Sequence, residues 1–310
     1  MQERWHADPQ RHAQSLRRGV LRAAAQGAQI ICLQELTLHR YFGDVMSPHL
    51  FDLAEPVDGG PTSALCRALA RESGAFIVAS LFERGTPRKR GARPTTPRYY
   101  NTAVVFAPDG SLVGFTRKQH IPRGAGYEEE FYFEAGDSDY PVHDLGLIKL
   151  AVPTCYDQWF PEVARIYALK GAELIVYPTA IGSEPEFPNF DSKPQWQIMM
   201  QSHAIANGLF IAAVNRTGRE TLVRFYGSSF ICAPTGQILA QAPRSRPAVI
   251  VADLDFRVMQ FWRKLFPLLE QRHPETYSLI TRSNAQAIPP ATVASRPTKK
   301  PERPPRRAAS

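Results

Sequence analysis

Apolar and polar positions near the start of the chain follow first a helical period and then the period of a buried strand. After Asp8 and Pro9, apolar residues recur at helical spacing as far as Gly27, so we expect a helix that Asp8 caps. The next run, residues 28–36, is short and almost wholly apolar, which is typical of a strand buried on both faces. The chain therefore begins as a helix that leads into a sheet.

The same alternation of helix and strand patterns continues to about residue 254. Helices are predicted over 61–73, 161–170 and 194–207. Strands are predicted over 75–83, 99–107, 112–117, 147–156, 174–177, 210–214, 228–233 and 249–254. Apolar strands that alternate with amphipathic helices indicate an α/β protein in which helices cover the sheets.

The composition changes near residue 283. Residues 284–310 contain six prolines, many basic residues and almost no large apolar side chains, so they cannot bury enough surface to offset their ordering entropy. We expect one domain over residues 1–283 and a disordered, basic, proline-rich tail over 284–310. Much of the net charge of +8 lies in this tail, which leaves the body nearly neutral. A nucleic-acid partner is therefore not expected, despite a pI of about 9.4.

The four cysteines, Cys32, Cys66, Cys155 and Cys232, lie far apart and in no metal-ligand spacing. This argues against a disulfide framework and a zinc site, and reduced thiols in a cytosolic protein are the simpler interpretation. The sequence has neither a signal-peptide pattern nor an apolar run of about 18 residues. We expect a soluble, cytoplasmic protein that has no membrane partner and no metal.

Three side chains with useful chemistry come at the ends of predicted strands. Cys155 ends one strand, and a helix begins at Pro161, so the thiol would project from a strand-to-helix turn whose N–H groups are free to bind an oxyanion. Glu35 ends the second predicted element, and Lys118 ends the hairpin. Each alone is more simply a buried filler, a surface charge or a solvated turn. Together they lie where α/β sheets usually place their sites.

Sequence motifs around these residues occur in a specific order. They are Gly-Ala-Gln-Ile-Ile-Cys-Leu-Gln-Glu-Leu ending at Leu36, Arg-Lys-Gln-His-Ile-Pro around Lys118, and Cys-Tyr-Asp-Gln-Trp-Phe-Pro-Glu from Cys155. A further run, Tyr-Glu-Glu-Glu-Phe, contains Glu129. From about residue 2 to about residue 280, the chain resembles the nitrilase-like carbon–nitrogen hydrolases, whose catalytic triad is Glu-Lys-Cys.

The resemblance implies a fold, an assembly and a set of roles. It implies a four-layer α-β-β-α sandwich, a homo-oligomer, and hydrolysis through a covalent thioester-like intermediate without a cofactor. Glu35 would be the general base for the Cys155 thiol, because a free thiol is mostly protonated at neutral pH. Lys118 would stabilise the thiolate and then, with the backbone N–H of Tyr156, the oxyanion. Glu129 would hold Lys118 or the substrate.

The substrate follows from a finer resemblance within the family. The run from Cys155 and the run Tyr-Pro-Thr-Ala-Ile-Gly-Ser-Glu-Pro that contains Glu184 look most like those of N-carbamoylputrescine amidases. The implied reaction converts N-carbamoylputrescine to putrescine, carbon dioxide and ammonia in polyamine biosynthesis. Glu184, Glu186 or Asp191 would face the cationic end of this substrate, and Tyr127, Trp159 and Phe160 would wall the pocket.

Two alternatives to this substrate assignment stay open. One is another N-carbamoyl-amine or ω-amide hydrolase, for example an N-carbamoyl-β-alanine amidohydrolase, whose acidic substrate would require an arginine near the pocket. The other is a catalytically inactive nitrilase-like binding protein.

The chain also departs from the family pattern at several points. The usual first strand is not seen before the helix, and Pro153 falls inside the predicted strand that leads to Cys155, where it would remove a ladder hydrogen bond. The stretch 261–274 differs from the usual ending of putrescine-type members.

Overall fold

The computed structural model describes residues 1–86 and 97–282, and its contacts divide the chain into two units, Met1–Glu270 and Gln271–Ser310. Every predicted site residue lies in the first unit. The described part of the second unit holds two short 3₁₀ turns, Pro274–Thr276 and Ser278–Thr281. The boundary predicted at 283 and the predicted tail lie at or beyond the end of the described residues.

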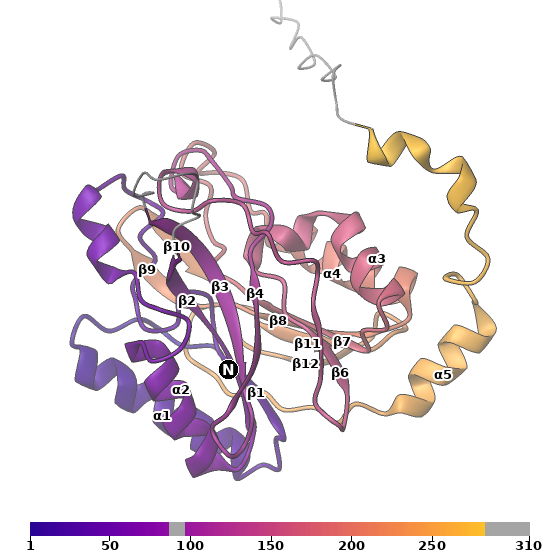
Figure 1. The fold of residues 1–310 in the computed structure, drawn as a ribbon, viewed down its shortest axis with the longest axis horizontal. Coiled ribbons are helices and arrows are strands. Elements are labelled where there is room, and N and C mark those ends of the chain that lie inside the picture. The colour runs from indigo at the N-terminus through magenta and orange to yellow at the C-terminus, as the bar shows by residue number, and fades with distance from the viewer. Residues whose placement is uncertain (87–96, 283–310) are drawn as a thin grey trace, which may run out of the picture. The chain divides into compact units, whose positions relative to one another are not determined.

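The first unit is built on two sheets (Figure 1). The smaller sheet has the order β1 (Ile30–Cys32), β2 (Phe76–Gly85), β3 (Arg98–Phe106), β4 (Leu112–Arg117). The larger has the order β12 (Ile238–Gln241), β11 (Phe230–Cys232), β8 (Phe210–Val214), β7 (Leu174–Pro178), β6 (Lys149–Ala151), β5 (Val142–Asp144). Strands β6, β7 and β8 run parallel, as do β1 and β2. A separate antiparallel ribbon joins β9 (Thr217–Glu220) to β10 (Val223–Tyr226).

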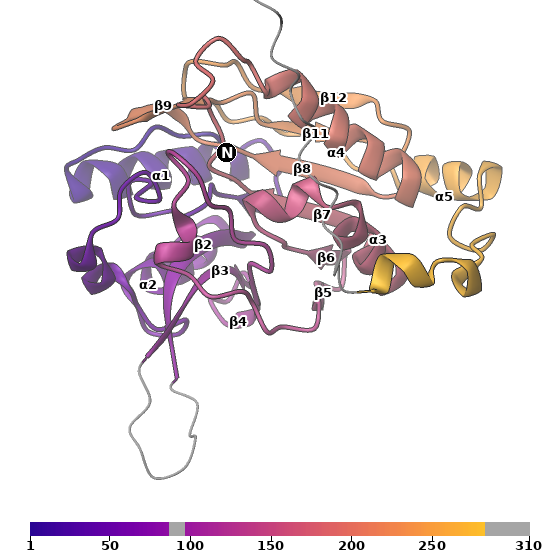
Figure 2. The ribbon, with the colours of Figure 1, turned by 90° about the horizontal axis from the view of Figure 1, so that it is seen from above.

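Helices cover the outer faces of both sheets (Figure 2). Leu16 and Val20 of α1 (Pro9–Ala24) and Leu69 of α2 (Pro61–Ser73) pack with residues of β1 and β2 in one apolar cluster. Helices α3 (Pro161–Leu169) and α4 (Lys193–Asn207) pack on β7 and β8 in a second cluster. A third cluster joins the inner faces of the two sheets. This arrangement confirms the predicted four-layer α-β-β-α sandwich.

Local chemistry explains why the predicted helices form. The Asp8 side chain accepts hydrogen bonds from the N–H groups of Gln10 and Arg11, and Pro9 occupies the first turn of α1. Helix α2 ends at Gly74, whose φ of 65° is the left-handed conformation that glycine adopts without strain. An additional helix, α5 (Phe256–Leu265), and the strands β5, β9, β10 and β12 were not predicted.

Three strand predictions need correction. The strand predicted over 28–36 is only Ile30–Cys32, so Glu35 lies beyond it. The strand predicted over 147–156 is only Lys149–Ala151. Pro153 lies beyond this strand and therefore removes no hydrogen bond from the sheet. The prediction of a strand over 249–254 is wrong. Within the described part of the chain, residues 249–254 pair with no strand. A cavity separates this segment from the free edge of β1.

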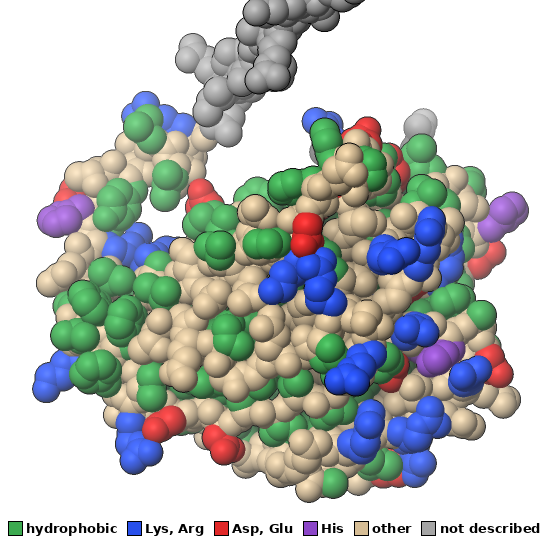
Figure 3. Space-filling view, turned by 180° about the vertical axis from the view of Figure 1, so that it is seen from behind, with side chains coloured by type: hydrophobic (Ala, Val, Ile, Leu, Met, Phe, Trp, Pro, Cys, Tyr) green, Lys and Arg blue, Asp and Glu red, His purple; other side chains and the backbone are tan. Residues whose placement is uncertain are grey.

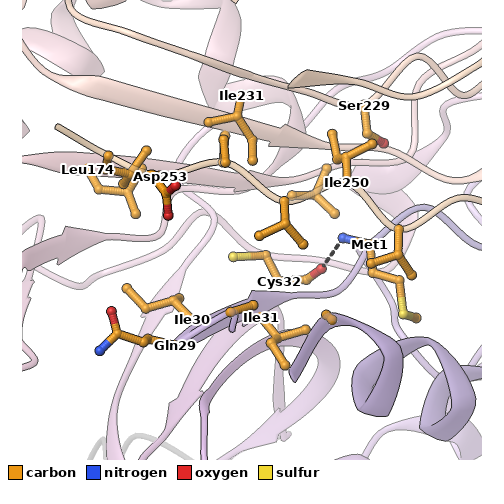
Figure 4. Close-up of a pocket in the computed structure, with 18 of the residues that line it drawn as sticks. Met1, Gln29, Ile30, Ile31, Cys32, Leu174, Ser229, Ile231, Ile250 and Asp253 are labelled. Carbon is orange, nitrogen blue, oxygen red and sulfur yellow. Dashed lines mark hydrogen bonds between the residues drawn. The ribbon is translucent and has the colours of Figure 1, made fainter. Parts of the chain in front are cut away.

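This cavity has a volume of about 200 Å³ and is lined mainly by apolar side chains (Figure 4). Ile30, Ile31 and Cys32 form one wall, and residues 249–254 form the other. The Met1 ammonium donates a hydrogen bond to the Cys32 carbonyl across 2.7 Å. The described residues before α1 form no strand, and Gln2 makes only an isolated bridge to Ala248. The smaller sheet therefore ends at β1, as the expected lack of a first strand implies.

None of the helices in residues 1–86 and 97–282 combines the length and the apolar character needed to cross a bilayer.

Candidate active site

The three predicted catalytic side chains come from separate elements and converge in the interior. Glu35 lies three residues beyond β1, Lys118 directly follows β4, and Cys155 is the first residue of the 3₁₀ helix η3 (Cys155–Trp159). The side chains of Glu35 and Lys118 are fully buried, and Cys155 is only 6% exposed. The site therefore lies where the chain leaves strands of the two sheets, although only Lys118 directly follows its strand.

The Lys118 ammonium lies between two carboxylates. Its Nζ donates to Oε1 of Glu35 at 3.0 Å and to Oε2 of Glu129 at 2.6 Å. The amide of Asn101 donates to the same Glu35 oxygen at 2.7 Å, and the Tyr41 hydroxyl donates to Oε1 of Glu129 at 2.9 Å. Each carboxylate is thus held by two donors, which is how buried charges are retained in a protein interior.

One oxygen of Glu35 has no hydrogen-bond partner among the described residues. Oε1 accepts from both Lys118 and Asn101, whereas Oε2 is buried and accepts no hydrogen bond from any described residue. An unpaired buried carboxylate oxygen costs free energy unless a donor or ligand fills the position. This oxygen is free to accept a proton.

Cys155 occupies a constrained turn. Its φ of 44° is in the left-handed region, where a non-glycine residue costs on the order of 1–3 kcal/mol and is characteristic of functional sites. The thiol donates to the Ala180 carbonyl at 3.8 Å. Because Tyr156 is in the first turn of η3, its N–H has no acceptor within the helix and is available to a ligand.

The charges of the site keep the resting thiol protonated. Burial raises the pKa of Cys155 well above its usual range, the Glu35 and Glu129 carboxylates raise it further, and the Lys118 cation opposes them. Burial lowers the pKa of Lys118, but the two carboxylates outweigh burial, so that its net pKa is raised. Burial also raises the pKa of Glu129. Two negative charges beside one positive charge therefore disfavour a resting thiolate.

Asp157 connects the Cys155 turn to the Lys118 loop. Its carboxylate accepts from the N–H groups of Thr154, Gln119 and His120, the last at 2.9 Å, and from the His120 ring. The contact with Thr154 is half of a capping box at the start of η3. One buried side chain thus fixes the relative position of the thiol and the ammonium.

The predicted substrate-binding residues divide into two groups. Tyr127 lies near both Glu184 and the thiol: the Tyr127 hydroxyl donates to the Ser183 carbonyl at 3.2 Å, and its pKa is raised by burial and by the neighbouring Glu184 and Cys155. Trp159 packs instead against the apolar cluster beneath α3 and α4, and the Tyr156 ring is 36% exposed against Phe160.

Several site residues were missed by the sequence analysis. Tyr41, Asn101 and Asp157 orient the charged groups, and the fully buried Arg216 donates to the Glu35 carbonyl at 2.6 Å. Asn101 was detectable as a polar residue in the middle of an apolar strand, and Asp157 as the fourth residue of a Thr-x-x-Asp capping pattern. The described residues contain no cluster of three or more His, Cys, Asp or Glu that could hold a metal ion.

Comparisons with known proteins show which family the chain resembles. A family model described as carbon–nitrogen hydrolase matches residues 1–264. A citrullinase of Francisella tularensis is 42% identical over 85% of this chain and 90% of its own length. An N-carbamoylputrescine amidase of Arabidopsis thaliana is 39% identical over 84% of this chain and 87% of its own length.

Solved structures share the fold. A carbon–nitrogen hydrolase from Helicobacter pylori superposes with a TM-score of 0.82 at 34% identity, covering 91% of this chain and 97% of its own. An amidase mutant from Nesterenkonia has a TM-score of 0.72 at 25% identity, covering 90% of this chain and 94% of its own. That structure carries the acetamide moiety of fluoroacetamide on its active-site cysteine.

Proposed function

Since the chain belongs to the carbon–nitrogen hydrolase family and is an enzyme that hydrolyses amide or ureido compounds, we propose that it uses Cys155, Glu35 and Lys118 to hydrolyse an N-carbamoyl-amine. The observation that carries this proposal is the free Oε2 of Glu35, buried in the same charged cluster as a protonated thiol. A protonated thiol requires a base with an unoccupied acceptor position to take its proton.

The proposed reaction has two proton-coupled steps. The Cys155 proton passes to Glu35 as sulfur attacks the carbamoyl carbon, and the oxyanion that forms is held by the Lys118 ammonium and the Tyr156 N–H. Collapse of this intermediate breaks a C–N bond, and Glu35 returns the proton to the departing nitrogen. Glu35 then takes a proton from water as the water attacks the thioester-like intermediate, which frees Cys155.

We propose N-carbamoylputrescine as the substrate, which places the reaction in polyamine biosynthesis. The similarity to N-carbamoylputrescine amidases supports this choice, as does Glu184, whose half-buried carboxylate accepts from Ser192 at 2.9 Å near Tyr127. Citrulline is a second candidate, supported by the 42% identity to a citrullinase. Both compounds carry a ureido group on an aliphatic chain and release carbon dioxide and ammonia.

We propose further that the enzyme works in the cytoplasm as a homo-oligomer. Hydrophobic side chains gather over α5 (Figure 3), where Phe261 is 60% exposed and Leu265 is 52% exposed. Ile198 of α4 is 65% exposed. Exposed apolar surface of this kind favours association. Sedimentation analysis should give a mass above the 34.7 kDa of one chain.

Ammonia release from N-carbamoylputrescine, L-citrulline and N-carbamoyl-β-alanine tests the reaction. The parent protein should hydrolyse at least one of the first two compounds. Cys155→Ser should abolish turnover and also the iodoacetamide adduct that mass spectrometry locates at residue 155. A parent protein that shows neither turnover nor alkylation would support the inactive binding protein, and selective hydrolysis of the third compound would support the acidic-substrate alternative.

A further inference from the structure

We propose that a buried ion pair between Arg216 and Glu220 positions both carboxylates that flank Lys118, and that the rate of the proposed hydrolysis depends on it. This inference rests on the proposed function and adds two positioning residues to it. Arg216 directly precedes β9, and Glu220 is the last residue of that strand. Their side chains are 0% and 3% exposed, and Nη1 of Arg216 donates to the two Glu220 oxygens at 3.0 and 2.7 Å.

Arg216 holds the backbone of the general base. Its Nη2 donates to the Glu35 carbonyl at 2.6 Å and, at longer distances, to the carbonyls of Leu36 at 3.2 Å and His39 at 3.3 Å. Leu36 has a φ of 47°, in the left-handed region, where a non-glycine residue persists only when its surroundings hold it. The guanidinium thus fixes the turn that begins at the residue proposed to take the thiol proton.

Glu220 reaches the second carboxylate through Tyr41. Oε2 of Glu220 accepts a hydrogen bond from the Tyr41 N–H at 2.7 Å. The hydroxyl of the same tyrosine donates to Oε1 of Glu129 at 2.9 Å, and Oε2 of Glu129 accepts from Lys118 at 2.6 Å. Tyr41 is fully buried. A continuous series of buried hydrogen bonds therefore runs from the ion pair to the Lys118 ammonium.

The chemistry of arginine suits this role. A guanidinium is planar and donates in fixed directions, so the Arg216 side chain can bind a carboxylate on one side and carbonyl groups on the other. Its guanidinium carbon lies 5.5 Å from the centre of the Phe225 ring, a cation–π distance that restricts the side chain further. A lysine at this position would keep the charge but not the fork of donors.

Stability alone does not explain such a buried pair. Removing two charges from water opposes folding about as strongly as their attraction favours it, so apolar residues of similar size are often equally stable in their place. Positioning has a larger effect on catalysis, because a displacement of about 1 Å at the reacting groups can lower a rate by about 10²-fold. We therefore expect the ion pair to affect kcat more than folding.

The segment 35–41 has a second attachment, which should keep it folded without the ion pair. On the side of β2, the Leu36 N–H donates to Oγ of Ser80 at 3.2 Å, and the Thr37 N–H donates to the Ser80 carbonyl at 2.8 Å. The Thr37 hydroxyl in turn accepts from the Ser80 N–H at 3.1 Å. Loss of the ion pair should thus loosen the segment without detaching it from the sheet.

Two variants and a control test the inference by ammonia release. Arg216→Met/Glu220→Leu replaces the ion pair by apolar side chains, whereas Arg216→Lys keeps a cation beside Glu220 but loses the fork that holds Glu35. Both should lower kcat at least about tenfold on the ureido compound that the parent hydrolyses, with KM within about threefold. The control Arg17→Met/Glu72→Leu, which replaces an ion pair between α1 and α2, should match the parent. If the double variant does not fold, Arg216→Lys alone decides.

A combined variant separates positioning from a general structural effect. If Arg216 acts through the base, adding Arg216→Lys to Glu35→Gln should lower kcat by less than about twofold further, because the group that it positions is already lost. A full further tenfold loss, or kcat within about twofold of the parent in folded Arg216→Lys, would overturn the inference and leave the proposed function in place. A parent protein that hydrolyses none of the three ureido compounds would overturn the proposed function and this inference with it.

Discussion

The charge balance around Lys118 determines the protonation state of the nucleophile. Lys118 contacts Glu35 and Glu129 directly, and the two carboxylates together raise the pKa of the Cys155 thiol, beyond the increase that burial causes. A buried ammonium paired with one carboxylate would be neutral overall, whereas this cluster carries one net negative charge when both carboxylates are ionised. The second carboxylate thus keeps the thiol protonated until substrate arrives.

Removing that second carboxylate should make the thiol more acidic. Glu129→Gln deletes a negative charge that raises the pKa of Cys155, so the pKa should fall and iodoacetamide alkylation at residue 155 should reach half its maximum rate at a lower pH. The adjacent exposed Glu130→Gln is the matched control and should leave the profile unchanged. An unchanged or higher midpoint for Glu129→Gln would contradict this charge balance.

Glu35→Gln should distinguish the role of Glu35 as a base from its role in the surrounding hydrogen bonds. The amide oxygen can still accept from Lys118 or Asn101, but it cannot take the thiol proton, so kcat should fall by about 10²–10⁴-fold. The thermal midpoint should change little compared with this loss. Retention of more than a tenth of parental kcat would show that another group serves as the base.

A buried histidine gives the protein an acid-sensitive element. His203 of α4 is 3% exposed, both ring nitrogens lack a partner among the described residues, and burial lowers its pKa to about 4. The unfolded chain therefore binds more protons than the folded one between pH 6.5 and about 4, so stability is lost as the pH falls through this window. The full effect is at most roughly 3 kcal/mol.

Urea unfolding at pH 7 and pH 4.5 tests this effect. His203→Leu should lose less stability between the two pH values than the parent protein, because it removes the group that takes up the proton. Substitution of the exposed His49, whose ring makes no described contact, serves as the control. Equal pH dependence in all three proteins would exclude His203 as the source.

At the scale of elements, the η3 turn and the Lys118 loop behave as one unit because Asp157 binds both. Asp157→Ala would leave the buried N–H groups of Thr154 and His120 without their acceptor. We expect kcat to fall at least tenfold and the thermal midpoint to drop by several degrees. Asp157→Asn, which retains one carbonyl oxygen, should recover part of both, and full parental kcat in Asp157→Ala would contradict the coupling.

Helices and strands were predicted better where the residues that define their ends are close together in the sequence. The start of α1 follows from Asp8 and Pro9, and the β3–β4 hairpin follows from the turn that ends in Gly110. Local signals could not show whether residues 249–254 form a strand, because strand pairing depends on a sheet edge that is far away in the sequence. The same reason explains the shortening of the strand before Cys155.

At the scale of the whole molecule, the apolar pattern alone indicated an α/β protein, and the four layers came from the family resemblance. Motifs identified Glu35, Lys118, Glu129 and Cys155, which are the residues that local sequence marks. Tyr41 escaped notice because its partner, Glu129, is 88 positions away.

The unpaired segment 249–254 also connects the sandwich to α5, and its amide groups donate no described hydrogen bond. Without ladder bonds, a backbone stretch opens more readily than the core strands around it. Its amides should exchange with deuterium orders of magnitude faster than those of β8, and a protease at low dose should cut there first and sever α5. Equal protection of the two segments would show that some partner holds this connection in place.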